Sequence, residues 1–117
     1  MRVKTNELTG AALDWAVAEA SGTPIYRSWK TLTRMDMDGQ HYWQPSIDWS
    51  QGGPIIEREG INLDNYAKNP KWSAWTPAPD RESGEAQAYG PTPLIAAMRC
   101  YVASKLGDEV EIPEELK

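Results

Sequence analysis

Cysteine, histidine and phenylalanine are almost missing from this chain of 117 residues, which has one Cys, one His and no Phe. The lone Cys100 cannot form an internal disulfide, which is typical of proteins that work in a reducing cytoplasm. The lone His41 leaves neither a histidine pair nor a Cys/His cluster to hold zinc. We therefore expect no metal site and no cofactor, and the scarcity of catalytic side chains favours a binding protein over an enzyme.

Positive charge and long apolar runs are also scarce. Twelve Lys and Arg residues stand against 17 Asp and Glu residues, which gives a net charge of −5. Because duplex DNA binding normally needs a basic surface, non-specific DNA binding is not expected. No secretion signal or membrane-spanning run is recognisable, so we expect no membrane association. The length is typical of one domain, 1–117, and the acidic residues 108–117 are interpreted as a solvated tail.

Tryptophan and tyrosine, by contrast, are abundant, with six Trp and five Tyr. Each has a polar group on a large ring, so both residue types suit half-buried positions and binding surfaces. The rings could form the core of a small protein or part of a binding surface, and the sequence leaves both interpretations open.

Two segments have the apolar spacing of a helix. Residues 9–22 begin at Thr9, a good N-cap. Residues 90–107 include Thr92 as an N-cap, followed by Pro93 at the first helical position. A glycine closes each segment, as is common at helix C-termini.

Antiparallel hairpins are expected between these helices. The first pairs residues 31–37 with 40–44 through the turn Asp38-Gly39, and the second pairs 71–76 with 85–89. This order of elements predicts an α+β fold. We expect a small, mainly antiparallel sheet that is packed by an N-terminal and a C-terminal helix.

A glycine–proline motif lies in the central segment 45–70, which is otherwise expected to be a long loop. We expect Pro54 to open a short helix, with the flexible Gly52 and Gly53 just before it. The first N–H groups of such a helix lack partners and attract anions. The sequence YGPTP (89–93) repeats the arrangement before the last helix. Tight turns would explain the same residues, so that alternative stays open.

A ring, a carboxylate, an amide and free N–H groups fall together at residues 48–53. We expect Trp49 to stack on a flat ring and Asp48 and Gln51 to hydrogen-bond polar edges of a ligand. These groups would face a recess that is open to solvent. The candidate ligand-binding residues are Asp48, Trp49, Gln51, Gly52, Gly53, Ile55, Thr92 and Arg99.

Three ordered blocks resemble the NinX-like family, whose members are small proteins of tailed phages and prophages of enteric bacteria. The blocks are LTGAALDWAVA (8–18), DWSQGGPIIERE (48–59) and GPTPLIAAMRCYVASKLGDEVEIPEEL (90–116). Ile47 and Ser50 stand where the family more usually has Thr and Ala. The resemblance implies a single-domain accessory protein that acts in the host cytoplasm. It brings no catalytic residues, and it favours a host-directed or anti-defence role over metabolism.

Two classes of function fit these observations. The first is non-enzymatic binding of a small anionic or nucleotide-like ligand, which would sequester a host immune signal. The alternative is a protein-binding module that inhibits a host enzyme through Trp-rich loops and an acidic surface. An enzyme that uses Asp48 and Glu57 as acid and base is least supported, because their spacing does not separate them from surface carboxylates. The alanine-rich first helix could also pack against a second copy, so a homodimer is one expectation.

Overall fold

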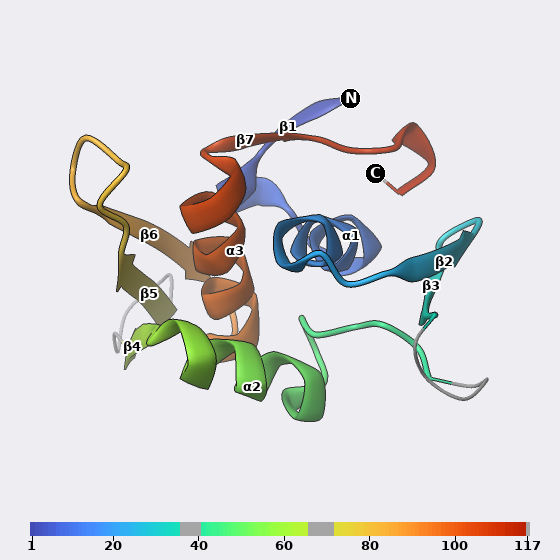
Figure 1. The fold of residues 1–117 in the computed structure, drawn as a ribbon, viewed down its shortest axis with the longest axis horizontal. Helices are drawn as coiled ribbons and strands as arrows, with labels where there is room; N and C mark the ends of the chain where they lie inside the picture. Colours follow the sequence, from blue (N-terminus) through green and yellow to red (C-terminus); the bar gives the residue numbers. More distant parts are fainter. Residues whose placement is uncertain (36–40, 66–71, 117) are drawn as a thin grey trace.

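The computed structural model describes residues 1–35, 41–65 and 72–116 (Figure 1). It confirms the predicted α+β class. The elements are β1 (Arg2–Lys4), the 3₁₀ helix η1 (Thr5–Glu7), α1 (Gly10–Ser21), β2 (Ile25–Ser28), β3 (Thr31–Arg34), α2 (Trp49–Glu59), β4 (Asn62–Asn65), β5 (Trp72–Pro77), β6 (Glu85–Gly90), α3 (Pro93–Leu106), β7 (Glu109–Glu111) and the 3₁₀ helix η2 (Glu114–Leu116).

Within the described residues, the strands form three small antiparallel sheets, ordered β1–β7, β2–β3 and β4–β5–β6. The predicted second hairpin is confirmed, because β5 pairs with β6 along both strands. The first is confirmed in part: the two predicted segments meet through a bridge between Thr33 of β3 and Tyr42, but the main partner of β3 is β2. The predicted turn Asp38-Gly39 lies outside the described residues.

Helix α3 is the centre of the fold, with β5 and β6 on one side, α1 on the other and α2 across one end (Figure 1). Small residues line the sheet where α3 crosses it, and these are Ala74, Ala86 and Ala88. Gly90 ends this row, and a Cβ there would lie 2.8 Å from the backbone nitrogen of Ala96. Close approach of α3 to the sheet therefore depends on the absence of side-chain bulk in β6.

The predicted boundaries of α1 and α3 are confirmed. Thr9 is the N-cap residue of α1, although its side chain makes no cap hydrogen bond, and Gly22 ends the helix in the left-handed conformation. The hydroxyl of Thr92 accepts a hydrogen bond from the Ile95 N–H at 3.1 Å, so it caps α3 as expected. Cys100 is fully buried in α3, and burial raises the pKa of its thiol to about 12, which makes it an inert core residue.

The expected start of the central helix is wrong. Helix α2 begins at Trp49 rather than at Pro54, and its N-cap is Asp48. The glycine pair and Pro54 lie inside the helix, which ends at Gly60 as expected. The strong cap explains the earlier start, because an Asp side chain that accepts from the first turn stabilises a helix N-terminus.

The interpretation of residues 108–117 as a solvated tail is also wrong. Strand β7 pairs with β1, and Val110, Ile112 and Leu116 are buried against the core. Glu109 and Glu111 alternate with these apolar residues and are exposed, which is the period of a half-buried strand. The acidic composition hid this alternation.

Candidate functional site

In the first turn of α2, the amide groups of Ser50, Gln51 and Gly52 already have partners within the chain. The Asp48 carboxylate accepts from the backbone N–H and the hydroxyl of Ser50, at 2.9 and 2.6 Å. The Asp48 carbonyl accepts from the N–H groups of Gln51 and Gly52, at 3.0 and 2.8 Å. Asp48 therefore accepts hydrogen bonds from the amide groups that were expected to bind an anion at this helix start. Trp49, beside it, is more than half exposed, at 55 %.

Gln51 uses its side-chain amide to hold a neighbouring segment of backbone. Its Oε1 accepts from the N–H of Gln44, and its Nε2 donates to the carbonyl of Tyr42, both at 2.7 Å. This is the bonding pattern that an adjacent strand would supply. Gln51 thus fixes residues 42–44 to the start of α2.

Gly52 and Ile55 serve the packing of α2. Gly52 is buried, and a Cβ at this position would lie 2.5 Å from the carbonyl oxygen of Pro45 and 2.6 Å from Cδ2 of Leu94. Ile55 belongs to the hydrophobic core. Gly53, in contrast, has open space around it, with its nearest neighbour atom 3.9 Å from a Cβ.

Thr92 and Arg99 lie on α3, where both have structural partners. Thr92 caps the helix, as described above. The Arg99 guanidinium is buried and donates to the carbonyls of Leu8 and Tyr89, each at 2.8 Å. Burial lowers the pKa of Arg99, and the two carbonyl acceptors hold its charge. Arg99 thereby ties β6 to the segment before α1.

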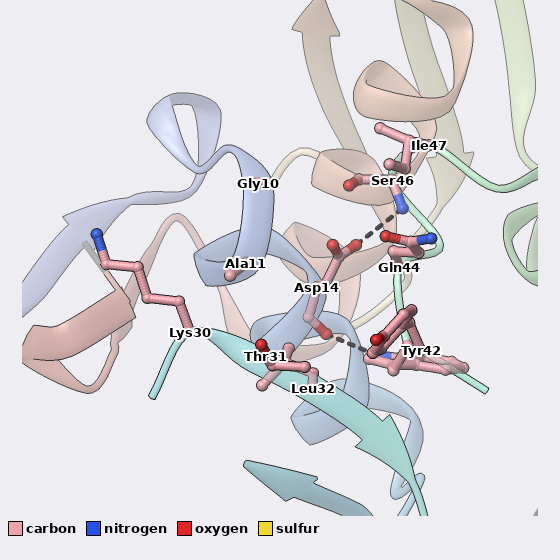
Figure 2. A pocket seen from close by; sticks show the side chains of 11 residues that line it. Gly10, Ala11, Asp14, Lys30, Thr31, Leu32, Tyr42, Gln44, Ser46 and Ile47 are labelled. Atoms are coloured by element: carbon pink, nitrogen blue, oxygen red, sulfur yellow. Dashed lines mark hydrogen bonds between the residues drawn. The ribbon is translucent and has the colours of Figure 1, made fainter. Parts of the chain in front are cut away.

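A pocket lies beside these residues, between α1, β3 and the segment that precedes α2 (Figure 2). Its volume is about 360 Å³, within the range of small-molecule sites. None of the eight candidate residues lines it. The lining residues are Gly10, Ala11, Asp14, Lys30, Thr31, Leu32, Tyr42, Trp43, Gln44, Ser46 and Ile47.

Asp14 is the ionisable group at the floor of this pocket, and only 4 % of its surface is exposed. Its Oδ1 accepts from the N–H of Ser46 at 2.8 Å, and its backbone carbonyl accepts from Nε1 of Trp43 at 2.8 Å (Figure 2). Burial raises the pKa of the Asp14 carboxyl from 3.8 to about 6, although the hydrogen bonds from Ser46 lower it. The pocket therefore contains a buried acceptor that can gain or lose a proton near neutrality.

The pocket wall is thus held from two sides. Asp14 of α1 fixes residues 43 and 46, and Gln51 of α2 fixes residues 42 and 44. Gln51, one of the predicted site residues, therefore supports the pocket wall although it does not line the pocket itself. Two other groups at the pocket differ in chemistry from Asp14: Tyr42 offers a ring that is 57 % exposed, and Lys30 extends away from Asp14 (Figure 2).

Sequence reasoning missed Asp14 as a site residue, although a signal was present. Asp14 is a carboxylate in an alanine-rich helix, three residues after Ala11 and four before Ala18. Residues at those spacings share a helix face, so an acid there is placed among apolar neighbours. Tyr42, Gln44 and Ser46 gave no such signal, because they come together with Asp14 only in the folded chain.

The family model described as Bacteriophage P22, NinX matches residues 4–105, which span the pocket, α1, α2 and all but the last residue of α3. The chain belongs to this NinX family. Membership confirms the resemblance that the three sequence blocks predicted, and it makes the chain a phage protein; the host compartment stays a prediction. No curated protein matches the chain.

The NinX chain also resembles the crystal structure of a phage protein from Bacillus cereus ATCC 14579. The TM-score is 0.63 at 12 % identity, and the match covers 87 % of this chain and 92 % of the other. Identity at that level shows a shared fold and no more. The fold of this NinX protein therefore recurs in a phage protein of very different sequence.

Within residues 1–35, 41–65 and 72–116, no three His, Cys, Asp or Glu side chains gather as a metal ion would require. Over the same residues, no helix has the length and apolar character needed to cross a membrane.

Replacing Gln51 with alanine is expected to lower the free energy of unfolding by about 1–2 kcal/mol, because two hydrogen bonds to the pocket wall are lost. Urea unfolding measures this change. Glu57→Ala, at an exposed position of the same helix, is the matched control, and we expect its effect to stay within about 0.5 kcal/mol. Equal unfolding midpoints for Gln51→Ala and the wild type would show that Asp14 alone holds the wall.

Proposed function

We propose that this NinX protein binds a small anionic, nucleotide-like ligand in the pocket between α1, β3 and residues 42–47, without turning it over. The observation that carries this proposal is the buried Asp14 carboxylate at the floor of a ligand-sized pocket. A buried acceptor of this kind is well suited to the N–H groups of a base or to the hydroxyls of a ribose. The site is adjacent to residues 48–53 and uses Gln51 as support.

The other groups at the pocket match the remaining parts of such a ligand. Tyr42 offers an exposed ring on which a base can stack. Lys30, whose side chain extends away from Asp14 (Figure 2), and the first-turn amides of Gly10 and Ala11 supply positive potential for a phosphate or carboxylate. The acid and the cation are thus separated, as the two ends of a nucleotide would need.

Binding without turnover is supported by what lines the pocket. Among the described lining residues, Asp14 is the one carboxylate and none is a histidine or cysteine, and the Lys30 side chain extends away from Asp14 (Figure 2), so no carboxylate or imidazole stands beside Asp14 as an acid–base partner. In a phage protein, sequestration of a nucleotide-like signal used in host defence would be a complete function. This role rests on the phage family and on the pocket together.

Calorimetry against a panel of cyclic nucleotides and ADP-ribose derivatives tests the proposal. At least one compound is expected to bind, and Asp14→Asn is expected to weaken its binding by about tenfold or more, because a charged acceptor is lost. Asp64→Asn changes an exposed acid of β4 and serves as the matched control. Absence of saturable heat across the whole panel would remove the proposal.

The alternative from the sequence, inhibition of a host enzyme through Trp-rich loops and an acidic surface, stays a prediction. Trp29 and Trp49 are exposed and available to a partner, whereas Trp43 is buried. The homodimer also stays a prediction. Its expected contact is weakened, because Ala12, Ala16 and Ala18 of α1 are buried within the chain itself.

A further inference from the structure

The β2–β3 hairpin has an uncovered face that carries two tyrosines in one row. Tyr26 of β2 is directly opposite Thr33 of β3, and Thr33 is opposite Tyr42 on its other side. Directly opposite residues share a sheet face, so the two rings flank Thr33 on the same surface. Tyr26 is 64 % exposed, and Figure 1 shows the hairpin extending from the body of the protein. We call Tyr26, Thr33, Tyr42 and the turn residue Trp29 the hairpin face.

Trp29 is held in a conformation that its side chain disfavours. It is the first of the two residues that connect β2 to β3, and its φ is 56°. Hairpin turns of this length need positive φ there and normally use Gly, Asn or Asp. The indole is also 71 % exposed, so core packing does not offset the strain. A strained and exposed tryptophan indicates a role outside folding.

Three basic side chains lie in the two ranges that carry the hairpin face. Residues 20–35 and 41–47 contain no Asp or Glu, but they include Arg27, Lys30 and Arg34. Arg27 pairs with Glu115 at 2.8 Å, and Arg34 lies over the Trp43 ring at 5.5 Å. Both acids of the intervening segment, Asp36 and Asp38, lie outside the described residues.

We propose that the hairpin face binds single-stranded nucleic acid. Stacking of bases on exposed aromatic rings, combined with nearby cations for the phosphates, is how proteins bind single strands without sequence preference. Tyr26 and Tyr42 lie two strand spacings apart, about 10 Å, which leaves room for a base on each. Trp29 at the tip adds a third ring. The bases of a duplex are already stacked on each other, so a duplex cannot use these rings.

The test measures fluorescence anisotropy of a labelled oligothymidylate of about ten nucleotides at 50 mM salt. Saturable binding is expected, and a duplex of the same length is expected to bind at least about tenfold more weakly. With Lys30 and Arg34 as the two contacting cations, the logarithm of the association constant should fall with the logarithm of salt concentration with a slope of about −1.4. A polyglutamate competitor that displaces the oligonucleotide equally well would instead show general attraction to polyanions, and would overturn the proposal.

Three variants separate this face from the pocket and from the rest of the surface. Trp29→Gly is expected to weaken binding about tenfold, and Tyr26→Ala similarly. Glycine suits the positive φ, so loss of binding by Trp29→Gly cannot be ascribed to unfolding. Tyr89→Ala, at an exposed tyrosine on β6, is the control and should leave binding unchanged. Wild-type affinity in both hairpin variants would overturn the proposal.

The substitution Glu115→Gln tests the hairpin face by strengthening oligonucleotide binding. Releasing Arg27 from its ion pair is expected to tighten oligonucleotide binding about threefold and to make the salt slope steeper by about 0.7. Unchanged or weaker binding would contradict the part assigned to Arg27. Tyr26, Trp29 and Glu115 do not line the pocket, so these variants test the hairpin face separately from the pocket, which shares only Tyr42 with it.

Discussion

Gly52→Ala is expected to lower the free energy of unfolding by about 2 kcal/mol, whereas Gly53→Ala is expected to change it by less than about 1 kcal/mol. A Cβ at position 52 would lie 2.5 Å from the carbonyl oxygen of Pro45 and 2.6 Å from Leu94. The Pro45 oxygen is backbone and cannot turn aside, so α2 must shift, and overpacking of this kind costs about 1–3 kcal/mol. The gain in helix propensity, about 1 kcal/mol, offsets only part of the cost.

Gly53 differs because a new methyl group would meet only open space and the Trp49 ring, 3.9 Å away. Its gain in helix propensity is opposed by crowding against the ring of Pro54, since a residue before proline disfavours the helical conformation. Urea unfolding of the two variants measures the difference, which we expect to reach about 2 kcal/mol. Equal stabilities would show that α2 is not packed as closely on Pro45 as the structure places it.

Asp14→Asn is expected to stabilise the protein at neutral pH, and its advantage over the wild type should grow with pH. Burial raises the pKa of Asp14 from 3.8 to about 6, so between these values the folded protein holds the proton and the unfolded chain has lost it. The contribution of Asp14 to the free energy of unfolding therefore falls as pH rises from about 4 to 6, and it stays low above 6. A shift of this size corresponds to about 3 kcal/mol.

The measurement is the difference in unfolding free energy between Asp14→Asn and the wild type, taken by urea titration from about pH 4 to pH 7.5. The difference should be small at pH 4 and should level off above about pH 6, because other titrating groups cancel between the two proteins. A difference that does not vary with pH would show that Asp14 is ionised throughout. Together with weaker ligand binding, a gain in stability would mark Asp14 as a residue kept for function at a cost in stability.

Local sequence signals predicted the elements that depend on neighbouring residues. Thr9 and Thr92 lie at the starts of α1 and α3, and Gly22 ends α1 in the left-handed conformation. The β5–β6 hairpin followed from its alternation. These features are set by caps and periodicity within a few residues, which is the range over which a sequence pattern acts directly.

The sequence predicted the region next to the candidate site but not the residues that line it. Residues 48–53 were expected to surround a recess, and Gln51 does support the wall of the pocket next to them. The prediction of free amides at Gly52 and Gly53 was wrong, because the helix starts after the Asp48 cap, five residues earlier than Pro54. The pocket itself joins Asp14 to Ser46 across 32 positions of the chain, and no local pattern encodes such a pair.

The sequence by itself determined the α+β class, the outer helices with their caps, the β5–β6 hairpin and membership of the NinX family. Only the tertiary structure decided that Gly52 serves close packing, that the acidic end pairs as β7 with β1, and that Asp14 is buried beside Ser46. The physical reason is the separation along the chain over which each effect acts. Caps and periodicity act between residues a few positions apart, whereas burial, strand partners and a shifted pKa arise from contacts between segments that meet only when the chain folds.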